Sequence, residues 1–324
     1  MEKEILLEIK NLKKYFPMKN FFGVKIGDLK AVDDVSFVIY KGETFGLVGE
    51  SGCGKSTLGR SILRMLRTDS GSVIYKGKDI ANLPEGEWKE YRSKLQIIFQ
   101  DPYSALNPNW TVKELISEPL RNAGMSRAQC RERVLELLKL VNMNADDMDK
   151  FSYEFSGGQR QRIGIARAVA SYPEFIFCDE PISALDVSVQ AQVVNMLKDL
   201  QKELGLTYLF TAHDLSMVHH ISDRIGVMYL GSMVELGTSE EVFNSPIHPY
   251  TRALISAIPI ADPETARHSS RIPIEGELPS PLKAPKGCRF CTRCPHATEQ
   301  CRQQRPEFRE LTPGHWVACH YPTV

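Results

Sequence analysis

The sequence lacks long hydrophobic runs and any excess of charge of one sign. No stretch of 18 or more apolar residues occurs in the 324 residues, so no segment is expected to span a bilayer. The charged start of the chain, with Glu2 and Glu4, is not that of a signal peptide. Lys and Arg total 40 and Asp and Glu total 40, which argues against a basic protein that coats nucleic acid. We therefore expect a cytosolic globular protein with reduced thiols.

Cysteine is scarce in most of the chain and concentrated near its end. Three of the eight cysteines are scattered over the first 264 residues, and five lie in the last 60. Eight of the 19 prolines fall within residues 265–324. Such segments cannot continue a helix or a central strand. We therefore predict a main domain over residues 1–260 and a proline- and cysteine-rich extension over residues 261–324, called the tail below.

The main domain alternates strand-like and helix-like patterns, without an internal repeat. The predicted strands lie within residues 5–12, 31–49, 72–80, 94–100, 175–181 and 207–214, and the predicted helices within residues 112–145 and 187–204. Strands that alternate with helices indicate a parallel sheet with helices on its faces. The fold class is therefore α/β.

A glycine-rich motif carries the strongest functional signal. Residues Gly49–Thr57 read GESGCGKST and fit G-x-x-x-x-G-K-[ST], between a strand-like and a helix-like segment. Glycines let backbone N–H groups converge on phosphate oxygens, and a helix N-terminus adds positive potential. Lys55 is expected to reach the β- and γ-phosphates, and Ser56 to bind Mg²⁺. The predicted nucleotide-binding residues here are Gly49, Ser51, Gly52, Gly54, Lys55, Ser56 and Thr57.

A second signal is the acidic end of a buried strand. The segment FIFCDE, from Phe175, ends in Asp179 and Glu180. The carboxyl edge of a parallel sheet is where such folds bind ligands. We expect Asp179 to bind Mg²⁺, directly or through water, and Glu180 to polarise the attacking water. A solvated acidic turn is the alternative interpretation.

The third motif completes a recognisable set. Glycines that lead into a helix often form only a cap, but they can also form an anion-binding helix start. Together with the first two motifs, the segment SGGQRQRIGIARAVA resembles the signature motif of ATP-binding cassette (ABC) ATPases, with Phe155 where Leu is usual. The resemblance adds a set of nucleotide-binding residues, Ser156, Gly157, Gly158 and Gln159.

Further family motifs occur in the expected order. Gln100 in IIFQDP matches the Q-loop, Ser183–Asp186 matches the D-loop, and His213 in TAHD matches the switch histidine. The resemblance implies catalytic roles for Gln100 and His213 beside Glu180, contacts of both with nucleotide, and Mg²⁺ binding by Gln100. Tyr15 or Phe16 would stack on adenine. Family spacing favours Phe16, and packing of one ring in the core is the alternative.

The resemblance also implies the architecture. An ABC nucleotide-binding domain has a RecA-like parallel-sheet core, an antiparallel β subdomain and a helical subdomain, here at about residues 101–160. Two such cassettes pair head to tail, so that each ATP would be held by Lys55 of one chain and Ser156 of the other.

A closer resemblance is to the ATP-binding subunits of bacterial oligopeptide and dipeptide permeases. Segments such as SPIHPYTRALISAIP and the tail sequence GCRFCTRCPHATEQC carry it. It implies an ATPase at the cytoplasmic face of the cell membrane that powers peptide import. The implied partners are a second, non-identical cassette, two membrane-spanning permease subunits and an extracytoplasmic peptide-binding protein. Nickel and glutathione importers also belong to this subfamily.

An alternative is a soluble cassette ATPase that acts on nucleic acid or in iron–sulfur assembly. The single cassette and the zero net charge argue against a nucleic-acid partner.

The tail has candidate metal ligands. The resembling subunits hold a 4Fe–4S cluster on the spacing of four cysteines here, Cys288, Cys294, Cys301 and Cys319. Thiolates also suit zinc, and unliganded thiols are a third interpretation. Cys291 departs from the family pattern and is either a spare thiol or an alternative ligand. Three histidines could also serve zinc: His296, His315 and His320. We expect the metal to staple a tail that lacks a core, and nucleotide binding to be independent of it.

Overall fold

A computed structural model describes residues 3–259, 271–277, 279–280, 282 and 284–322. The chain divides into two compact units. Among the described residues, the first unit holds residues 3–4, 40–44 and 82–212, and the second unit holds the rest. The predicted boundary between residues 260 and 261 lies outside the described residues.

The first unit is built on three parallel strands. Strand β7 (Phe175–Asp179) lies between β6 (Leu95–Ile98) and β8 (Thr207–Thr211), with Ile98 opposite Cys178 and Asp179 opposite Thr211. Every residue of β7 and β8 is buried. A parallel strand that is covered on both faces needs a continuous apolar run, which is the pattern that predicted these strands.

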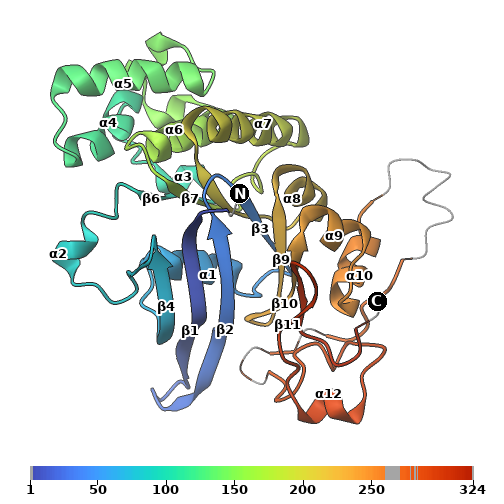
Figure 1. The fold of residues 1–324 in the computed structure, drawn as a ribbon. Coiled ribbons are helices and arrows are strands. Elements are labelled where there is room, and N and C mark those ends of the chain that lie inside the picture. Colours follow the sequence, from blue (N-terminus) through green and yellow to red (C-terminus); the bar gives the residue numbers. More distant parts are fainter. Residues whose placement is uncertain (1–2, 260–270, 278, 281, 283, 323–324) are drawn as a thin grey trace. The chain divides into compact units, whose positions relative to one another are not determined.

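Helices make up most of the rest of the first unit. They are α2 (Glu85–Trp88), α3 (Pro102–Ala105), α4 (Val112–Asn122), α5 (Arg127–Leu140), α6 (Gly157–Val169) and α7 (Val187–Leu204), with 3₁₀ turns at Ala145–Asp149 and Ser152–Glu154. Helix α4 packs against α5 and α6 (Figure 1). The helical pattern of residues 112–145 is confirmed as two helices. They are separated where Gly124 adopts a φ of 86° and Ser126 caps α5.

The second unit contains a four-stranded sheet in the order β2-β1-β4-β5. These strands are β1 (Ile5–Lys19), β2 (Lys25–Tyr40), β4 (Ser70–Tyr75) and β5 (Lys78–Asp79). Strand β4 pairs antiparallel with both β1 and β5, as expected for an antiparallel subdomain. The long strands β1 and β2 stand side by side (Figure 1). Strand β1 runs well beyond the predicted residues 5–12.

The other strands of the second unit form a sheet that includes β9 (Arg224–Tyr229). Strand β3 (Thr44–Val48) is parallel to β9, and β10 (Ser232–Thr238) is antiparallel to it. The tail adds β12 (His315–Val317) next to β10, and β11 (Arg309–Thr312) next to β12. The proline-rich composition of the tail gave no indication of these strands.

Short helices complete the second unit. They are α1 (Lys55–Ile62), α8 (Leu215–Ile221), α9 (Ser239–Asn244), α10 (Pro249–Ser256) and α12 (Glu299–Gln303). Within the described residues, no helix is long and apolar enough to cross a membrane.

Candidate functional site

The glycine-rich motif forms a loop between β3 and α1 in the second unit. Gly49 has a φ of 150°, and a Cβ atom there would lie 2.2 Å from the carbonyl oxygen of Met228. Gly54 has a φ of 109°, and its Cβ would lie 2.0 Å from the carbonyl oxygen of Ala31. Only glycine fits either position, so the motif spacing follows from the path of the backbone.

The Lys55 ammonium is held by carbonyl oxygens of the same loop. Lys55 is buried, and its Nζ donates to the carbonyl oxygens of Gly49, at 2.8 Å, and Glu50, at 3.3 Å. Gly54 is the N-cap of α1 and provides no side-chain cap. The first N–H groups of α1 and the Lys55 ammonium therefore lie at the same loop, an arrangement that suits the binding of a phosphate group.

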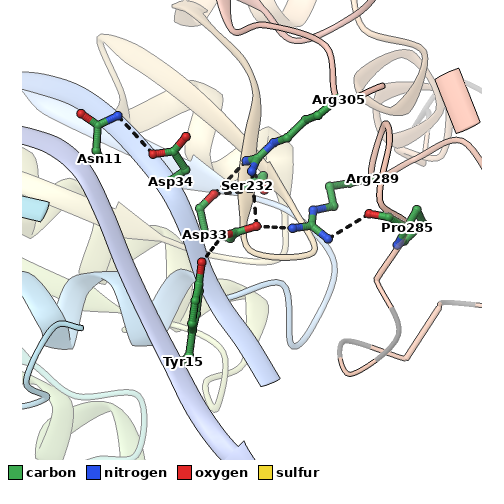
Figure 2. Close-up of polar contacts among 8 residues, drawn as sticks. All are labelled: Asn11, Tyr15, Asp33, Asp34, Ser232, Pro285, Arg289 and Arg305. Carbon is green, nitrogen blue, oxygen red and sulfur yellow. Dashed lines mark hydrogen bonds and ion pairs between the residues drawn. The ribbon is translucent and has the colours of Figure 1, made fainter. Parts of the chain in front are cut away.

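Two aromatic residues of β1 are candidates for stacking on a base. Tyr15 and Phe16 are both partly buried. Neighbouring residues of a strand face opposite sides of the sheet, so the two rings cannot share one base. The Tyr15 hydroxyl donates to Asp33 on β2 (Figure 2). Burial together with this hydrogen bond raises the pKa of Tyr15. The choice of Phe16 stays a prediction.

The two acidic residues lie at the carboxyl end of β7 in the first unit. Asp179 is fully buried and Glu180 is 5% exposed, which excludes a solvated acidic turn. Glu180 has a φ of 47°, and its N–H donates to Oγ1 of Thr211 at 3.0 Å. Thr211 in turn donates to the carbonyl oxygen of Cys178 at 3.1 Å. The sheet thus holds Glu180 in a costly backbone conformation, which is typical of functional sites.

The signature motif begins α6, as predicted. Ser156 caps the helix: Gln159 N–H donates to the Ser156 hydroxyl at 3.4 Å, and Ser156 N–H donates to Gln159 Oε1 at 3.0 Å. Both residues are exposed. A Cβ at Gly158 would lie 2.7 Å from Cγ1 of Val189, so glycine permits the close approach of α7. Ser156, Gly158 and Gln159 line a groove of about 560 Å³.

Gln100 and His213 each follow a strand and are exposed. Gln100 comes two residues after β6, whose end lies beside the end of β7 that bears Asp179. His213 comes two residues after β8 and belongs to the second unit. The structure therefore places Gln100 with the acidic residues of the first unit, and His213 with the phosphate-binding loop's unit.

All five cysteines of the tail line one small cavity of the second unit. The cavity is also lined by His248, His296 and His320. Burial raises the pKa of the Cys288 thiol to about 12. Among the residues that the structure describes, no group of three or more His, Cys, Asp or Glu residues is arranged to hold a metal ion. The cavity thus gathers soft donors without presenting a formed coordination site.

His315 lies elsewhere. Its Nε2 is 2.8 Å from Oε1 of Glu235, a fully buried residue of β10. Glu235 also accepts the backbone N–H groups of Ile247 and His248. His315 therefore fixes β12 to β10, and it is not among the residues that line the cysteine cavity.

Comparison with known proteins identifies the family. Residues 32–183 match the ABC transporter family model, and residues 234–301 match the model for the oligopeptide/dipeptide transporter C-terminal region. The chain is 52% identical to the oligopeptide transport ATP-binding protein AppF of Bacillus subtilis over 98% of this chain and 97% of AppF. The chain is an ABC transporter ATPase. It is also 50% identical to OppF of Escherichia coli, an oligopeptide transport ATP-binding protein, over 98% of this chain and 96% of OppF.

Solved structures of ABC ATPases agree with the fold. A post-hydrolysis dimer of the cassette MJ0796, bound to ADP and Pi, matches 72% of this chain and 99% of its own with a TM-score of 0.65 and 28% identity. The cassette cbiO1 of Clostridium perfringens matches 75% of this chain and 92% of its own with a TM-score of 0.66 and 27% identity. ATP is therefore the nucleotide of this ABC ATPase, and Mg²⁺ is its expected companion.

Hydrogen bonds from inside and outside the motifs support the ABC ATPase site. Ser183 of the D-loop donates its hydroxyl to the carbonyl oxygen of Glu180 at 3.0 Å, and Gln190 Nε2 donates to the carbonyl oxygens of Ile182 and Leu185. The D-loop is thereby fixed to both Glu180 and α7. No sequence signal marks Gln190 or Thr211 for these roles, because their partners are brought to them only by folding.

Proposed function

We propose that this ABC ATPase powers the uptake of dipeptides or oligopeptides from the cytoplasmic face of the cell membrane. The observation that carries the proposal is the match of residues 234–301 to the oligopeptide/dipeptide transporter region. Relatives named for oligopeptide transport that share about half of all residues add support. The implied partners are membrane-spanning permease subunits and an extracytoplasmic peptide-binding protein.

The residues present fit the chemistry of ATP hydrolysis. In the second unit, Lys55 and the loop N–H groups bind the β- and γ-phosphates. Ser56, Asp179 and Gln100 offer the hydroxyl, carboxylate and amide oxygens that Mg²⁺ prefers. Bound Mg²⁺ would neutralise phosphate charge. In the first unit, the buried Glu180 orients and polarises the attacking water.

The remaining nucleotide contacts follow from the same proposal. His213 completes the catalytic group, and Phe16 or Tyr15 stacks on adenine. The other nucleotide-binding residues are Gly49, Ser51, Gly52, Gly54 and Thr57.

The signature motif is proposed to serve a second, non-identical cassette. Ser156 and Gln159 are exposed at the N-terminus of α6 and line a groove together with Arg162. An exposed helix start beside a guanidinium suits a phosphate from another molecule. Gly157 and Gly158 would let the backbone approach it closely.

A separate groove of the first unit supports a contact with a membrane subunit. It measures about 290 Å³ and is lined in part by Ile97, Phe99, Leu106 and Pro119. These residues come from β6, α3, α4 and their connections, close in sequence to Gln100. A groove with both apolar and polar lining, close to the Q-loop, would let a bound segment of a membrane subunit influence hydrolysis.

The tail is proposed to hold a 4Fe–4S cluster on Cys288, Cys294, Cys301 and Cys319. The convergence of these thiols on one cavity supports the proposal, and four thiolates are the usual ligands of such clusters. Zinc is the lesser alternative. It is considered because His296 and His320 line the same cavity and histidine is a common zinc ligand. Cys291 lines the cavity too and remains a spare donor.

Uptake measurements test the function. A strain that lacks this chain should fail to take up radiolabelled peptides, and the wild-type chain, but not Lys55→Ala, should restore uptake. Nickel and glutathione uptake are measured in parallel. Restoration of either one without peptide uptake would contradict the peptide assignment. Purification from native membranes should recover permease subunits, whereas retention on DNA at physiological salt without them would favour the soluble alternative.

A further inference from the structure

Arginines of the tail contact residues of the phosphate-binding loop and of β2. Arg289 directly follows Cys288, and Arg293 directly precedes Cys294. Both side chains are less than 10% exposed and face carboxylates of the main domain. The buried ends of these arginines therefore join the cysteine-bearing part of the tail to the phosphate-binding loop and to β2.

Arg293 binds the phosphate-binding loop directly. Its Nη1 lies 3.0 and 2.8 Å from the two carboxylate oxygens of Glu50, and 3.3 Å from the Tyr229 hydroxyl. The N–H of Glu50 donates to the Tyr250 hydroxyl at 2.9 Å, and its carbonyl oxygen accepts from Lys55. Every polar part of Glu50 thus has a partner, and one of them is supplied by the tail.

The contact joins a buried guanidinium to a carboxylate that is only partly buried. Burial opposes the charge on Arg293, but its hydrogen bonds to Glu50 and Tyr229 raise the pKa of Arg293 above its ordinary value. Removal of one partner of a buried pair leaves the other without compensation. Loss of Arg293 would therefore release Glu50 to move toward water, and the loop backbone with it.

A second contact holds the tail in place (Figure 2). Asp33, which is 5% exposed, accepts hydrogen bonds from Tyr15, Arg289 and Arg305. Arg305 also donates to the Asp33 carbonyl oxygen at 2.8 Å and to the Ser232 hydroxyl at 2.9 Å. This cluster anchors the tail on β2 independently of Arg293, so Arg293 is presented to the loop from a fixed base.

Backbone hydrogen bonds hold the turn that carries both Arg293 and the first tail cysteines. The N–H of Arg293 donates to the Phe290 carbonyl oxygen at 3.0 Å, and the N–H of Cys291 donates to the Cys288 carbonyl oxygen at 3.2 Å. The N–H of Cys288 donates to the Cys301 carbonyl oxygen at 2.8 Å. A change in how the thiols are arranged would therefore shift the turn that carries Arg293.

We propose that Arg293 is a positioning residue for the phosphate-binding loop, and that the arrangement of the tail cysteines sets nucleotide affinity through it. The inference rests on ATP binding by the loop and not on the identity of the transported molecule. It replaces the expectation that nucleotide binding is independent of the tail.

Calorimetric titration of the full chain with Mg-ADP tests the first part. Arg293→Ala should weaken binding about fivefold, the lower end of typical coupling between sites. Arg293→Lys should recover much of the loss. In a Glu50→Gln background, Arg293→Ala should cost little more, because its partner is already changed. Arg302→Ala is the matched control, since Arg302 is also next to a cysteine but is exposed. Unchanged affinity in Arg293→Ala, or an equal loss in the Glu50→Gln background, would overturn the proposal.

Cys294→Ser tests the second part. It should weaken Mg-ADP binding in the wild-type chain but not in Arg293→Ala. An equal loss in both backgrounds would show that the cysteines act by another route, and no loss would refute the coupling. Thermal unfolding by circular dichroism reports whether each variant is folded. Iron content, measured on the same samples, separates a failure of this inference from a failure of the cluster assignment.

Discussion

Glu180 shows at the scale of one residue how the fold positions the proposed catalytic carboxylate. Its side chain is buried at the end of β7, whereas the proposed phosphate contacts belong to the loop around Lys55. Glu180→Gln should therefore keep ATP binding but lower turnover by at least about 10²-fold, the scale of a general base. Lys55→Ala should lose binding as well. The check is the ATPase rate of the complete transporter beside nucleotide titration, and near-normal turnover in Glu180→Gln would contradict the role.

The positive φ of Glu180 gives a second prediction. Thr211→Val removes the hydroxyl that accepts the Glu180 N–H, so a buried donor loses its partner. We expect a loss of about 1–3 kcal/mol in the free energy of unfolding, together with slower hydrolysis. Thr251→Val is the control, because the buried Thr251 hydroxyl has no hydrogen-bond partner among the residues that the structure describes. Denaturant unfolding and turnover measure both effects, and equal losses in the two variants would argue against a specific role for Thr211.

These residues also mark the limit of prediction from the sequence. Gly49, Gly54 and Lys55 could be predicted, because one continuous segment determines the loop's conformation and its chemistry. Thr211 and Arg293 could not. Their partners are distant in sequence, and only the pairing of strands and the docking of the tail bring them into contact.

At the scale of elements, the attachment of the tail to β2 depends on one carboxylate. Burial alone would raise the pKa of Asp33, but the hydrogen bond from Tyr15 and the charges of Arg289 and Arg305 outweigh it and lower the pKa below 3.8. Folding therefore favours the ionised form of Asp33, and the ionised carboxylate stabilises the folded chain. Its contribution is present above about pH 4 and is lost as the pH falls through the folded-state pKa.

Asp33→Asn tests this attachment. At pH 7 it should destabilise the chain by about 3 kcal/mol, because Arg289 is left buried without its counter-charge. The difference from wild type should stay constant down to about pH 5, shrink as the pH falls from about 4 through the lowered Asp33 pKa, and be smallest below it. Asp34→Asn is the matched control, since Asp34 is exposed and accepts only from Asn11 in Figure 2. Urea unfolding across pH is the measurement, and a difference that grows on acidification would have the wrong sign.

Elements differed in how well their sequences predicted them. The strands β7 and β8 are buried on both faces and appear in the sequence as unbroken apolar runs. The tail strands β11 and β12 are three or four residues long and mostly polar or partly exposed. Their pairing depends on β10, where Glu235 lies opposite Val317. No local pattern could have indicated that partner.

At the scale of the whole molecule, the exposed signature motif predicts a weak ATPase when the chain is alone. If Ser156 serves another cassette, the rate per chain should rise steeply with protein concentration or on addition of the partner cassette. Steady-state ATPase assays over a wide dilution range measure this dependence. A high rate that does not change with concentration would indicate a self-contained site.

The cysteine cavity gives a prediction of colour and composition. Protein purified without oxygen should be brown, with about four iron and four sulfide per chain if one cluster is bound. Cys294→Ser should lose the colour and leave the tail sensitive to proteases, and Cys291→Ser should be milder. Stoichiometric zinc without iron would reject the cluster. Loss of colour in Cys291→Ser alone would mean that a different set of four cysteines binds it.

The second unit is assembled from segments on both sides of the first unit in the sequence. Arg293 and Glu50 are 243 residues apart, and Arg289 and Asp33 are 256 apart. During synthesis the phosphate-binding loop leaves the ribosome early, but Arg293, whose side chain holds it, is made near the end. At about 5–20 residues per second, the loop waits on the order of ten seconds or more for this arginine. An unfinished or truncated chain would thus carry the motif without this support, and we expect it to bind ATP more weakly than the completed chain.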